Sequence, residues 1–275
     1  MDHFLNHVID TVTGKAPYDG AFFVIFVLQP IAKESMAQIL SDKELRRYSR
    51  QIMLEDVGVE GQEALKAASV LVVGAGGLGC PALQYLTAAG IGTIGIVEFD
   101  MVNESNIHRQ ILYGANDIGK LKSIIAKSIL RNRNDKVNIE IFNLRLTGEN
   151  AAKIFAPYDI VLDATDNYET RYVIDDACSE SGKPMVHGAI YKHEAQVSVF
   201  NYNGGPSYRG YNPPEGAKRD NPDPSQLGLF GVLPGIAGVM MASEALKIVV
   251  KAGDILSGRV LIFDLMTNRY YTIDI

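Results

Sequence analysis

The chain has 275 residues, of which 47% are hydrophobic and 21% charged, and its formal charge is −6. This length allows one large α/β domain and no more than two domains. The acidic balance argues against a nucleic-acid partner, which needs a clustered basic surface, and we see no apolar run of about 20 residues that would span a membrane.

The two cysteines, Cys80 and Cys178, could pair in principle. The start of the chain does not resemble a secretory signal, so we expect both thiols to be buried and reduced. This pattern predicts a cytoplasmic protein.

Residues 1–35 are predicted to be a poorly ordered N-terminal extension. Met36 is followed by Ser41 and Glu44, which have the spacing of a helix capping box, so the folded part is expected to start near Met36. The apolar run 22–28 is too short to span a membrane, but it could instead form an extra edge strand.

From residue 67 onward, β and α signals alternate. The apolar, β-branched runs predict strands at 69–73, 93–97, 137–142, 160–164 and 185–189. Helices are expected after residue 79 and at 119–132, 150–155 and 168–181. This order predicts a Rossmann-like, mostly parallel sheet with helices on both faces.

The pattern changes after residue 190. The segment 195–202 alternates like a half-exposed strand, 203–226 is rich in Gly, Pro and Asn, and 235–250 is helical. The segments 259–265 and 269–275 predict an antiparallel hairpin. We therefore expect one domain over 36–275, with a nucleotide-binding half at about 67–190 and a mixed-sheet tail at about 191–275.

A glycine-rich loop follows the first strand and opens a helix. Glycines at 74, 76, 77 and 79 let the backbone approach phosphates, and the helix N-terminus supplies free N–H groups. Glu98 ends the next strand, where an acidic group can accept hydrogen bonds from ribose hydroxyls. These residues predict a nucleotide site but do not distinguish ATP from a nicotinamide dinucleotide.

Polar side chains then crowd beyond the strand ends. They are Asp100, Asn103, Asn106, Arg109, Gln110 and Lys122, followed by Asp163–Asn167 after a later strand. Each alone could be a cap, a turn or a surface charge. Together at one sheet edge they are typical of a triphosphate site, because Arg and Lys neutralise phosphate charge and carboxylates hold Mg²⁺.

From about Leu40 to the end, the chain resembles the adenylyltransferases of the MoeB/ThiF/HesA group, which activate sulfur-carrier proteins. The resemblance is carried by Arg47–Gln51, Gly74–Gly79, Glu98–Asp100, Ser105–Gln110, Gly119–Lys122, Asp163–Asn167, Gly231–Gly235 and Glu244–Lys247. It implies ATP and Mg²⁺ as cofactors and a ubiquitin-like sulfur-carrier protein ending in Gly-Gly as the partner.

The resemblance also implies a role for each matching residue. Gly74, Gly76, Gly77, Gly79, Glu98, Asp100, Ser105, Asn106, Gln110 and Asn167 would bind the nucleotide. Arg109 and Lys122 would act on the phosphates, and Asp166 would coordinate Mg²⁺. Arg50 would reach across a homodimer interface to the neighbouring active site. The carrier's terminal carboxylate would attack the α-phosphorus, giving an acyl-adenylate and pyrophosphate.

The chain departs from this family pattern at two places. Many relatives hold a structural zinc ion with two Cys-x-x-Cys pairs, whereas here Ser207–Gly210 stands at the first pair, so we predict no zinc site. Some relatives carry a cysteine in the loop that corresponds to 221–226, where this chain has none. We therefore expect the reaction to stop at the acyl-adenylate.

Three other interpretations remain open from the sequence. An NAD-linked oxidoreductase would account for the glycine loop and Glu98 but not for the later cations. A binding protein that has lost turnover would account for the missing cysteines. Finally, the adenylated carboxylate could belong to a peptide or a tRNA-borne group.

Overall fold

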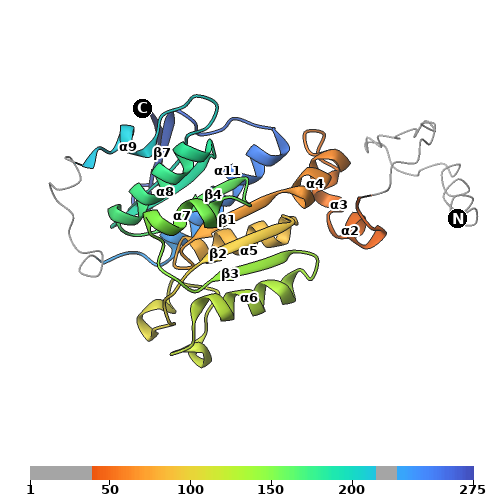
Figure 1. Cartoon of the computed structure of the whole chain (residues 1–275), viewed down its shortest axis with the longest axis horizontal. Coiled ribbons are helices and arrows are strands. Elements are labelled where there is room, and N and C mark those ends of the chain that lie inside the picture. Colours follow the sequence, from red (N-terminus) through yellow and green to blue (C-terminus); the bar gives the residue numbers. More distant parts are fainter. Residues whose placement is uncertain (1–38, 215–227) are drawn as a thin grey trace, which may run out of the picture. The chain divides into compact units, whose positions relative to one another are not determined.

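The structure is built on an eight-stranded sheet with strand order β3-β2-β1-β4-β5-β6-β7-β8. It is a computed structural model that describes residues 39–214 and 228–275 (Figure 1). The predicted extension at 1–35 and the possible strand at 22–28 therefore lie outside the described residues.

Five strands form the parallel part of the sheet. They are β1 (Ser69–Val73), β2 (Thr93–Val97), β3 (Asn138–Phe142), β4 (Ile160–Asp163) and β5 (Met185–Tyr191). Three antiparallel strands extend it, namely β6 (Glu194–Phe200), β7 (Arg259–Asp264) and β8 (Arg269–Asp274). The predicted Rossmann-like sheet with a mixed C-terminal part is confirmed.

Helices cover both faces because successive side chains of a strand point to opposite sides. One face of the sheet, which includes Val70 and Val72, packs in one core cluster with side chains from four helices. The other face, which includes Leu71 and Val73, packs mainly with side chains from two other helices. The first group is α4 (Gly58–Ala67), α5 (Gly79–Ala89), α6 (Lys122–Arg133) and α11 (Val232–Val250). The second is α7 (Gly148–Phe155) and α8 (Tyr168–Ser181).

Helix α11 is long and apolar enough, by length and composition, to cross a membrane. It carries the charged residues Glu244 and Lys247, and Leu233, Ala237 and Met241 are fully buried in the core. It packs on α5, β5 and β6. Within this fold α11 is a core helix, which explains its apolar composition without a membrane.

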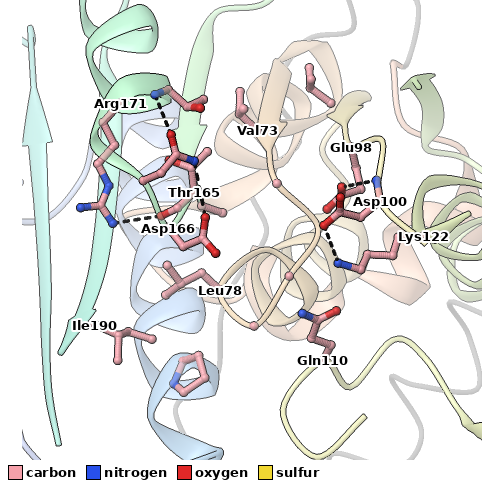
Figure 2. Close-up of a pocket in the computed structure, with 18 of the residues that line it drawn as sticks. Val73, Leu78, Glu98, Asp100, Gln110, Lys122, Thr165, Asp166, Arg171 and Ile190 are labelled. Carbon is pink, nitrogen blue, oxygen red and sulfur yellow. Dashed lines mark hydrogen bonds and ion pairs between the residues drawn. The ribbon is translucent and has the colours of Figure 1, made fainter. Parts of the chain in front are cut away.

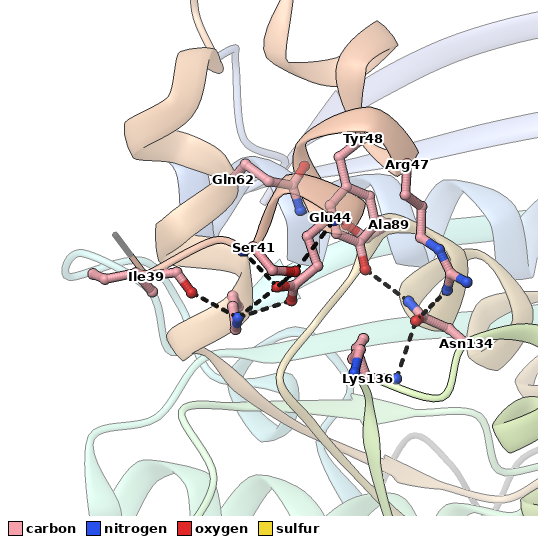
Figure 3. Close-up of polar contacts among 10 residues, drawn as sticks. Ile39, Ser41, Glu44, Arg47, Tyr48, Gln62, Ala89, Asn134 and Lys136 are labelled. Atoms are coloured by element: carbon pink, nitrogen blue, oxygen red, sulfur yellow. Dashed lines mark hydrogen bonds and ion pairs between the residues drawn. The ribbon is translucent and has the colours of Figure 1, made fainter. Parts of the chain in front are cut away.

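Polar contacts fix the first two helices of the described part of the chain, α2 (Asp42–Arg47) and α3 (Ser49–Ile52), to the rest of the fold (Figure 3). Ser41 and Glu44 form the predicted capping box, and Lys66 of α4 reaches Glu44 at 2.8 Å. Asn134 donates hydrogen bonds to the Tyr48 hydroxyl at 2.8 Å and the Thr87 carbonyl at 2.9 Å. These bonds hold the segment that carries Arg50.

The Gly- and Pro-rich segment 203–226 is not wholly irregular, since it contains a short helix, α9 (Tyr208–Tyr211). The buried carboxylate of Asp175 accepts 2.9 Å bonds from the backbone N–H groups of Tyr208 and Arg209, and Ser207 caps Gly210 at 3.0 Å. These bonds satisfy the free N–H groups of the first turn. Sequence patterns missed α9 because the Asp175 contact comes from α8.

Candidate active site

A pocket of about 480 Å³ opens at the carboxyl ends of the parallel strands, where open α/β sheets bind ligands. Its walls come from the loop after β1, the ends of β2, β4 and β5, the segments before α6 and after β3, and the first turn of α11. Figure 2 shows Thr165, Asp166 and Arg171 on one side of the glycine loop and Glu98, Asp100 and Lys122 on the other.

Most of the predicted site residues lie together in this pocket. Those that line it are Gly74, Gly76, Gly77, Glu98, Asp100, Arg109, Gln110, Lys122, Asp166 and Asn167. Those that do not line it are Arg50, Gly79, Ser105 and Asn106.

The glycine loop requires its glycines for close backbone packing. Gly74 has a φ of +96°, and an added Cβ would lie 2.7 Å from the Ala164 carbonyl oxygen. At Gly79 a Cβ would lie 2.0 Å from the Gly74 carbonyl oxygen. Gly79 therefore lets helix α5 start close to the loop, which is a packing requirement and not a contact with the pocket.

Glu98 ties the end of β2 to the glycine loop. One carboxylate oxygen accepts the Ala75 N–H at 2.9 Å, and the other accepts the Asp100 N–H at 2.9 Å. The side chain is 7% exposed. Each oxygen keeps a second lone pair, so a ribose hydroxyl can still donate to it.

Lys122 is the first residue of α6, and its Nζ lies 3.1 Å from a carboxylate oxygen of Asp100. The backbone N–H of Lys122 also donates to the Asp100 carbonyl at 3.0 Å. Lys122 is 5% exposed, yet its side chain lines the pocket. The ion pair thus holds a buried ammonium group at the pocket wall, where two further N–H donors remain.

Ser105 and Asn106 shape the loop that presents Arg109 and Gln110. They belong to the short helix η1 (Glu104–Asn106), whose Ser105 carbonyl accepts a 2.8 Å bond from the Arg109 guanidinium. The Asn106 carbonyl accepts the Gln110 N–H at 2.9 Å. Gln110 is 5% exposed, and its Oε1 has no hydrogen-bond partner among the described residues. Such an atom is expected where a ligand or water completes the site.

Asp166 and Asn167 follow the end of β4. Asn167 caps α8 by accepting the Thr170 N–H at 2.9 Å, and its amide lies 3.5 Å from Asp166. Asp166 is exposed and forms no ion pair within the described part of the chain. Its carboxylate therefore remains available to a ligand in the pocket.

Several pocket residues were missed in the sequence. Phe99 and Arg145 lie together, with the guanidinium carbon 5.2 Å from the ring centroid, and Arg171 and Lys192 line the other side. Arg145 follows β3 and Lys192 follows β5. The same strand-end rule that located Asp100 and Asp166 would have found both.

The pocket carries excess positive charge among the described residues. Its cationic side chains are Arg109, Lys122, Arg145, Arg171 and Lys192, and its carboxylates are Glu98, Asp100 and Asp166. An excess of cations in a concave site favours an anionic ligand with several charges.

Both cysteines are unpaired and fully buried, as expected. Burial raises the pKa of the Cys80 thiol to about 12 and also raises that of Cys178. Protonated, inaccessible thiols are poor nucleophiles. Among the described residues no group of three or more His, Cys, Asp or Glu side chains is arranged to hold a metal ion.

Arg50 lies on α3, outside the pocket, and its side chain is exposed. Met53 and Leu54, which follow it closely, are 71% and 55% exposed. Arg50 is therefore not part of the pocket formed by its own chain.

The fold and the pocket define the class: a Rossmann-like protein with a cationic pocket at the carboxyl ends of its parallel strands. The ThiF family pattern matches residues 48–275, and the chain belongs to this family. It is 49% identical over 236 residues to a sulfur carrier protein adenylyltransferase of Thermus thermophilus, with 83% of this chain and 86% of that protein covered. A probable molybdopterin-synthase adenylyltransferase of Porphyra purpurea is 48% identical over 83% of this chain and 60% of its own length. The relatives identify the chain as an adenylating enzyme.

Solved structures agree on the fold. PaaA matches with a TM-score of 0.74 at 22% identity, covering 100% of this chain and 83% of that chain. MccB of E. coli, crystallised with MccA-N7isoASN, matches with a TM-score of 0.72 at 18% identity, covering 86% of this chain and 73% of that chain. At these identities the comparison extends to the fold alone.

Proposed function

We propose that this enzyme uses ATP and Mg²⁺ to adenylate the C-terminal glycine carboxylate of a ubiquitin-like sulfur-carrier protein. The observation that carries the proposal is the pocket itself, in which a glycine loop and Glu98 adjoin Arg109, Lys122 and Asp166. The names of the relatives, sulfur carrier protein adenylyltransferase and molybdopterin-synthase adenylyltransferase, support the same substrate class. The alternative of an NAD-linked oxidoreductase is not supported, because these relatives are adenylyltransferases.

The nucleotide would lie along the glycine loop. Gly76 and Gly77 allow phosphates to approach the backbone, and the N-terminus of α5 supplies N–H groups and positive dipole. Glu98 would accept a ribose hydroxyl while holding the Ala75 and Asp100 backbone. Asp100, which holds Lys122, and Asn167, which caps α8, would also contribute to binding the nucleotide.

The phosphates would lie against Arg109, Lys122 and Gln110. The guanidinium and ammonium groups would balance the triphosphate charge and stabilise charge on the departing pyrophosphate. The amide nitrogen of Gln110, which can donate to a phosphate oxygen, lies 3.6 Å from where a Cβ on Gly76 would be. This proximity of a side-chain donor to the glycine loop supports a role for Gln110 beside the phosphates.

Asp166 fits a magnesium site that is shared with the substrate. Mg²⁺ commonly takes one or two protein carboxylates, with phosphate oxygens and water as its other ligands. Asp166 is exposed at the pocket and has no ion-pair partner among the described residues. When bound there, Mg²⁺ would neutralise part of the phosphate charge.

The reacting carboxylate needs no base, because a C-terminal carboxyl group is ionised at neutral pH. One of its oxygens would form a bond to the α-phosphorus as the bond to the bridging oxygen of pyrophosphate breaks. Arg109 and Lys122 would hold the leaving group in line. The buried thiols of Cys80 and Cys178 are poor acceptors, so we propose that the reaction of this chain ends at the acyl-adenylate.

We further propose a cytoplasmic homodimer in which Arg50 completes the partner's active site. Arg50 is exposed on α3 beside the exposed apolar residues Met53 and Leu54. Clustered exposed apolar side chains favour a protein interface. The loop that carries Arg109 also exposes Met101 and Ile111, at 61% each.

The test is ATP–pyrophosphate exchange with Mg²⁺ and one candidate carrier at a time. We expect exchange that requires a carrier with an intact Gly-Gly end and that disappears in Asp166→Ala. A carrier lacking the last glycine is the matched substrate control. Exchange driven by a short peptide and not by any carrier would instead support a peptide carboxylate, and ATP binding without exchange would support a protein that has lost turnover.

A further inference from the structure

A buried polar cluster lies directly behind the loop that carries Asp166. Asp163, at the end of β4, is fully buried, and His187 of β5 is 2% exposed. The His187 Nδ1 lies 2.7 Å from one carboxylate oxygen of Asp163. The side-chain hydroxyl and backbone N–H of Thr165 donate to the other oxygen at 2.5 Å and 3.1 Å.

Arg171 of α8 closes the cluster from the opposite side. Its guanidinium donates to the Thr165 carbonyl at 3.0 Å (Figure 2). Its Nε lies 3.8 Å from the Asp163 oxygen that His187 contacts. Thr165 is therefore held at its N–H, hydroxyl and carbonyl. Asp166, the next residue, has no comparable contact in the described part of the chain.

The charges around His187 indicate which ring nitrogen carries its proton. Burial lowers the pKa of His187, although its bond to Asp163 acts in the other direction. Burial by itself would raise the pKa of Asp163, but the bond from His187 and the nearby Arg171 lower it overall. A carboxylate can only accept, so a neutral imidazole must carry its proton on Nδ1. The buried Asp163 and Arg171 charges then compensate each other.

We propose that His187 is a positioning residue, which fixes Asp163 so that Thr165 presents the Asp166 carboxylate to the metal-bound triphosphate. The inference rests on the proposed function for the role of Asp166. His187 itself does not line the pocket and touches no reacting group. It acts through the chain of contacts from His187 to Asp163 and from Asp163 to Thr165.

The packing of His187 makes it a rigid support. Its ring lies 4.8 Å from the Tyr208 ring and 5.8 Å from the Phe200 ring. Both aromatic residues are buried, and β5 pairs with β4 so that His187 is opposite Asp163 in the register. A donor fixed by packing holds its acceptor in one orientation.

Two substitutions separate the hydrogen bond from the bulk of the side chain. In His187→Asn the amide nitrogen can occupy the place of Nδ1, whereas in His187→Gln the amide lies one bond further out. Phe200→Leu is the control, because it removes only one of the two ring contacts and leaves Tyr208 and the Asp163 bond to hold the imidazole. His187→Leu removes the donor altogether.

The first readout is hydrogen exchange of the Thr165 backbone amide in the full chain without ligand. We expect protection to fall about tenfold in His187→Leu and His187→Gln and to stay within about twofold in His187→Asn and Phe200→Leu. The second readout is the factor by which Mg²⁺ tightens ATP binding, which we expect to fall about tenfold in the same two variants, with ATP affinity in EDTA unchanged.

Equal behaviour of His187→Asn and His187→Gln would overturn the proposal, as would an equal loss in Phe200→Leu. This comparison remains available if His187→Leu does not fold. Normal Thr165 protection and normal Mg²⁺ dependence in His187→Gln would also overturn it. If the wild-type chain fails to bind ATP, the proposed function is wrong, whereas the exchange of Thr165 still reports whether His187 supports the loop.

Discussion

At the scale of single residues, some side chains of this site hold the backbone with the same atoms that we propose bind the ligand. Glu98 is the clearest case, because its two oxygens join the glycine loop to the end of β2 at 2.9 Å each. A nucleotide bound beside it would meet a carboxylate that is already oriented. Removing one acceptor should therefore affect binding more than the chemical step.

We predict that Glu98→Gln raises the KM for ATP about tenfold and changes kcat less, since an amide cannot accept both backbone bonds. Steady-state exchange kinetics at saturating carrier would measure both constants. Glu104→Gln, a nearby exposed carboxylate that does not line the pocket, is the matched control. An unchanged KM in Glu98→Gln would show that this carboxylate does not hold the nucleotide.

Glu44 is a second carboxylate whose hydrogen bonds hold backbone in place, and these bonds stabilise the fold. Burial alone would raise its pKa, but hydrogen bonds from Lys66 and Ser41 lower the pKa from 4.5 to about 2. A group whose pKa is depressed in the folded state stabilises the fold above its unfolded pKa and loses that contribution as the pH falls toward its folded pKa. The relevant window is therefore pH 4.5 down to about 2.

We predict that Glu44→Gln lowers the free energy of unfolding by about 2 kcal/mol at pH 7 and that the difference from wild type shrinks as the pH falls from 4.5 toward 2. Urea unfolding at several pH values would measure it. Glu60→Gln on exposed α4 surface is the control. A pH-independent difference would mean that the ion pair with Lys66 is not its cause.

At the scale of elements, the glycine loop, β1 and α5 form one packed unit. Gly79 begins α5 in close contact with the Gly74 carbonyl, so the helix axis and the loop are fixed together. This arrangement aims the helix N-terminus at the pocket. A single methyl group at Gly79 would force the backbone of either the loop or the helix to move.

We predict that Gly79→Ala destabilises the fold by about 2–4 kcal/mol and weakens ATP binding, although Gly79 does not line the pocket. Gly148→Ala is the matched control, since a Cβ there meets no atom within 4 Å and its φ lies outside the left-handed region. Unfolding by urea and ATP binding would be measured for both. Equal stability of the two variants would contradict the packing argument.

At the scale of the whole molecule, the position of Arg50 bears on whether the chain forms a dimer. The pocket contains the predicted phosphate and metal groups, but Arg50 lies outside it. An exposed arginine beside Met53 and Leu54 is suited to a neighbouring subunit. A dimer would then have two composite sites, each with Asp166 from one chain and Arg50 from the other.

We predict that Arg50→Ala and Asp166→Ala are each inactive but regain about a quarter of wild-type exchange activity when equal amounts are mixed and allowed to trade subunits. Half of the dimers would be mixed, and each would contain one intact composite site. Size-exclusion chromatography would establish the dimer separately. If mixing two dimeric variants restores nothing, Arg50 does not act across the interface.

Much of this architecture follows from local sequence. The β-branched runs, the capping pair Ser41 and Glu44 and the apolar spacing of α6 depend on neighbours in the chain, so the types of these elements could be predicted along with approximate bounds. The strand-end rule then brought Glu98, Lys122 and Asp166 to one pocket.

What the sequence by itself determined was the order and kind of the elements, the glycine loop and the family motifs, because these depend on neighbours in the chain. Only the tertiary structure decided that Arg171 of α8 lines the pocket, that Asp175 caps α9, and that His187 contacts Asp163. These contacts join segments far apart in the chain. They depend on strand order and on the long-range packing of helices against the sheet, which local patterns do not encode.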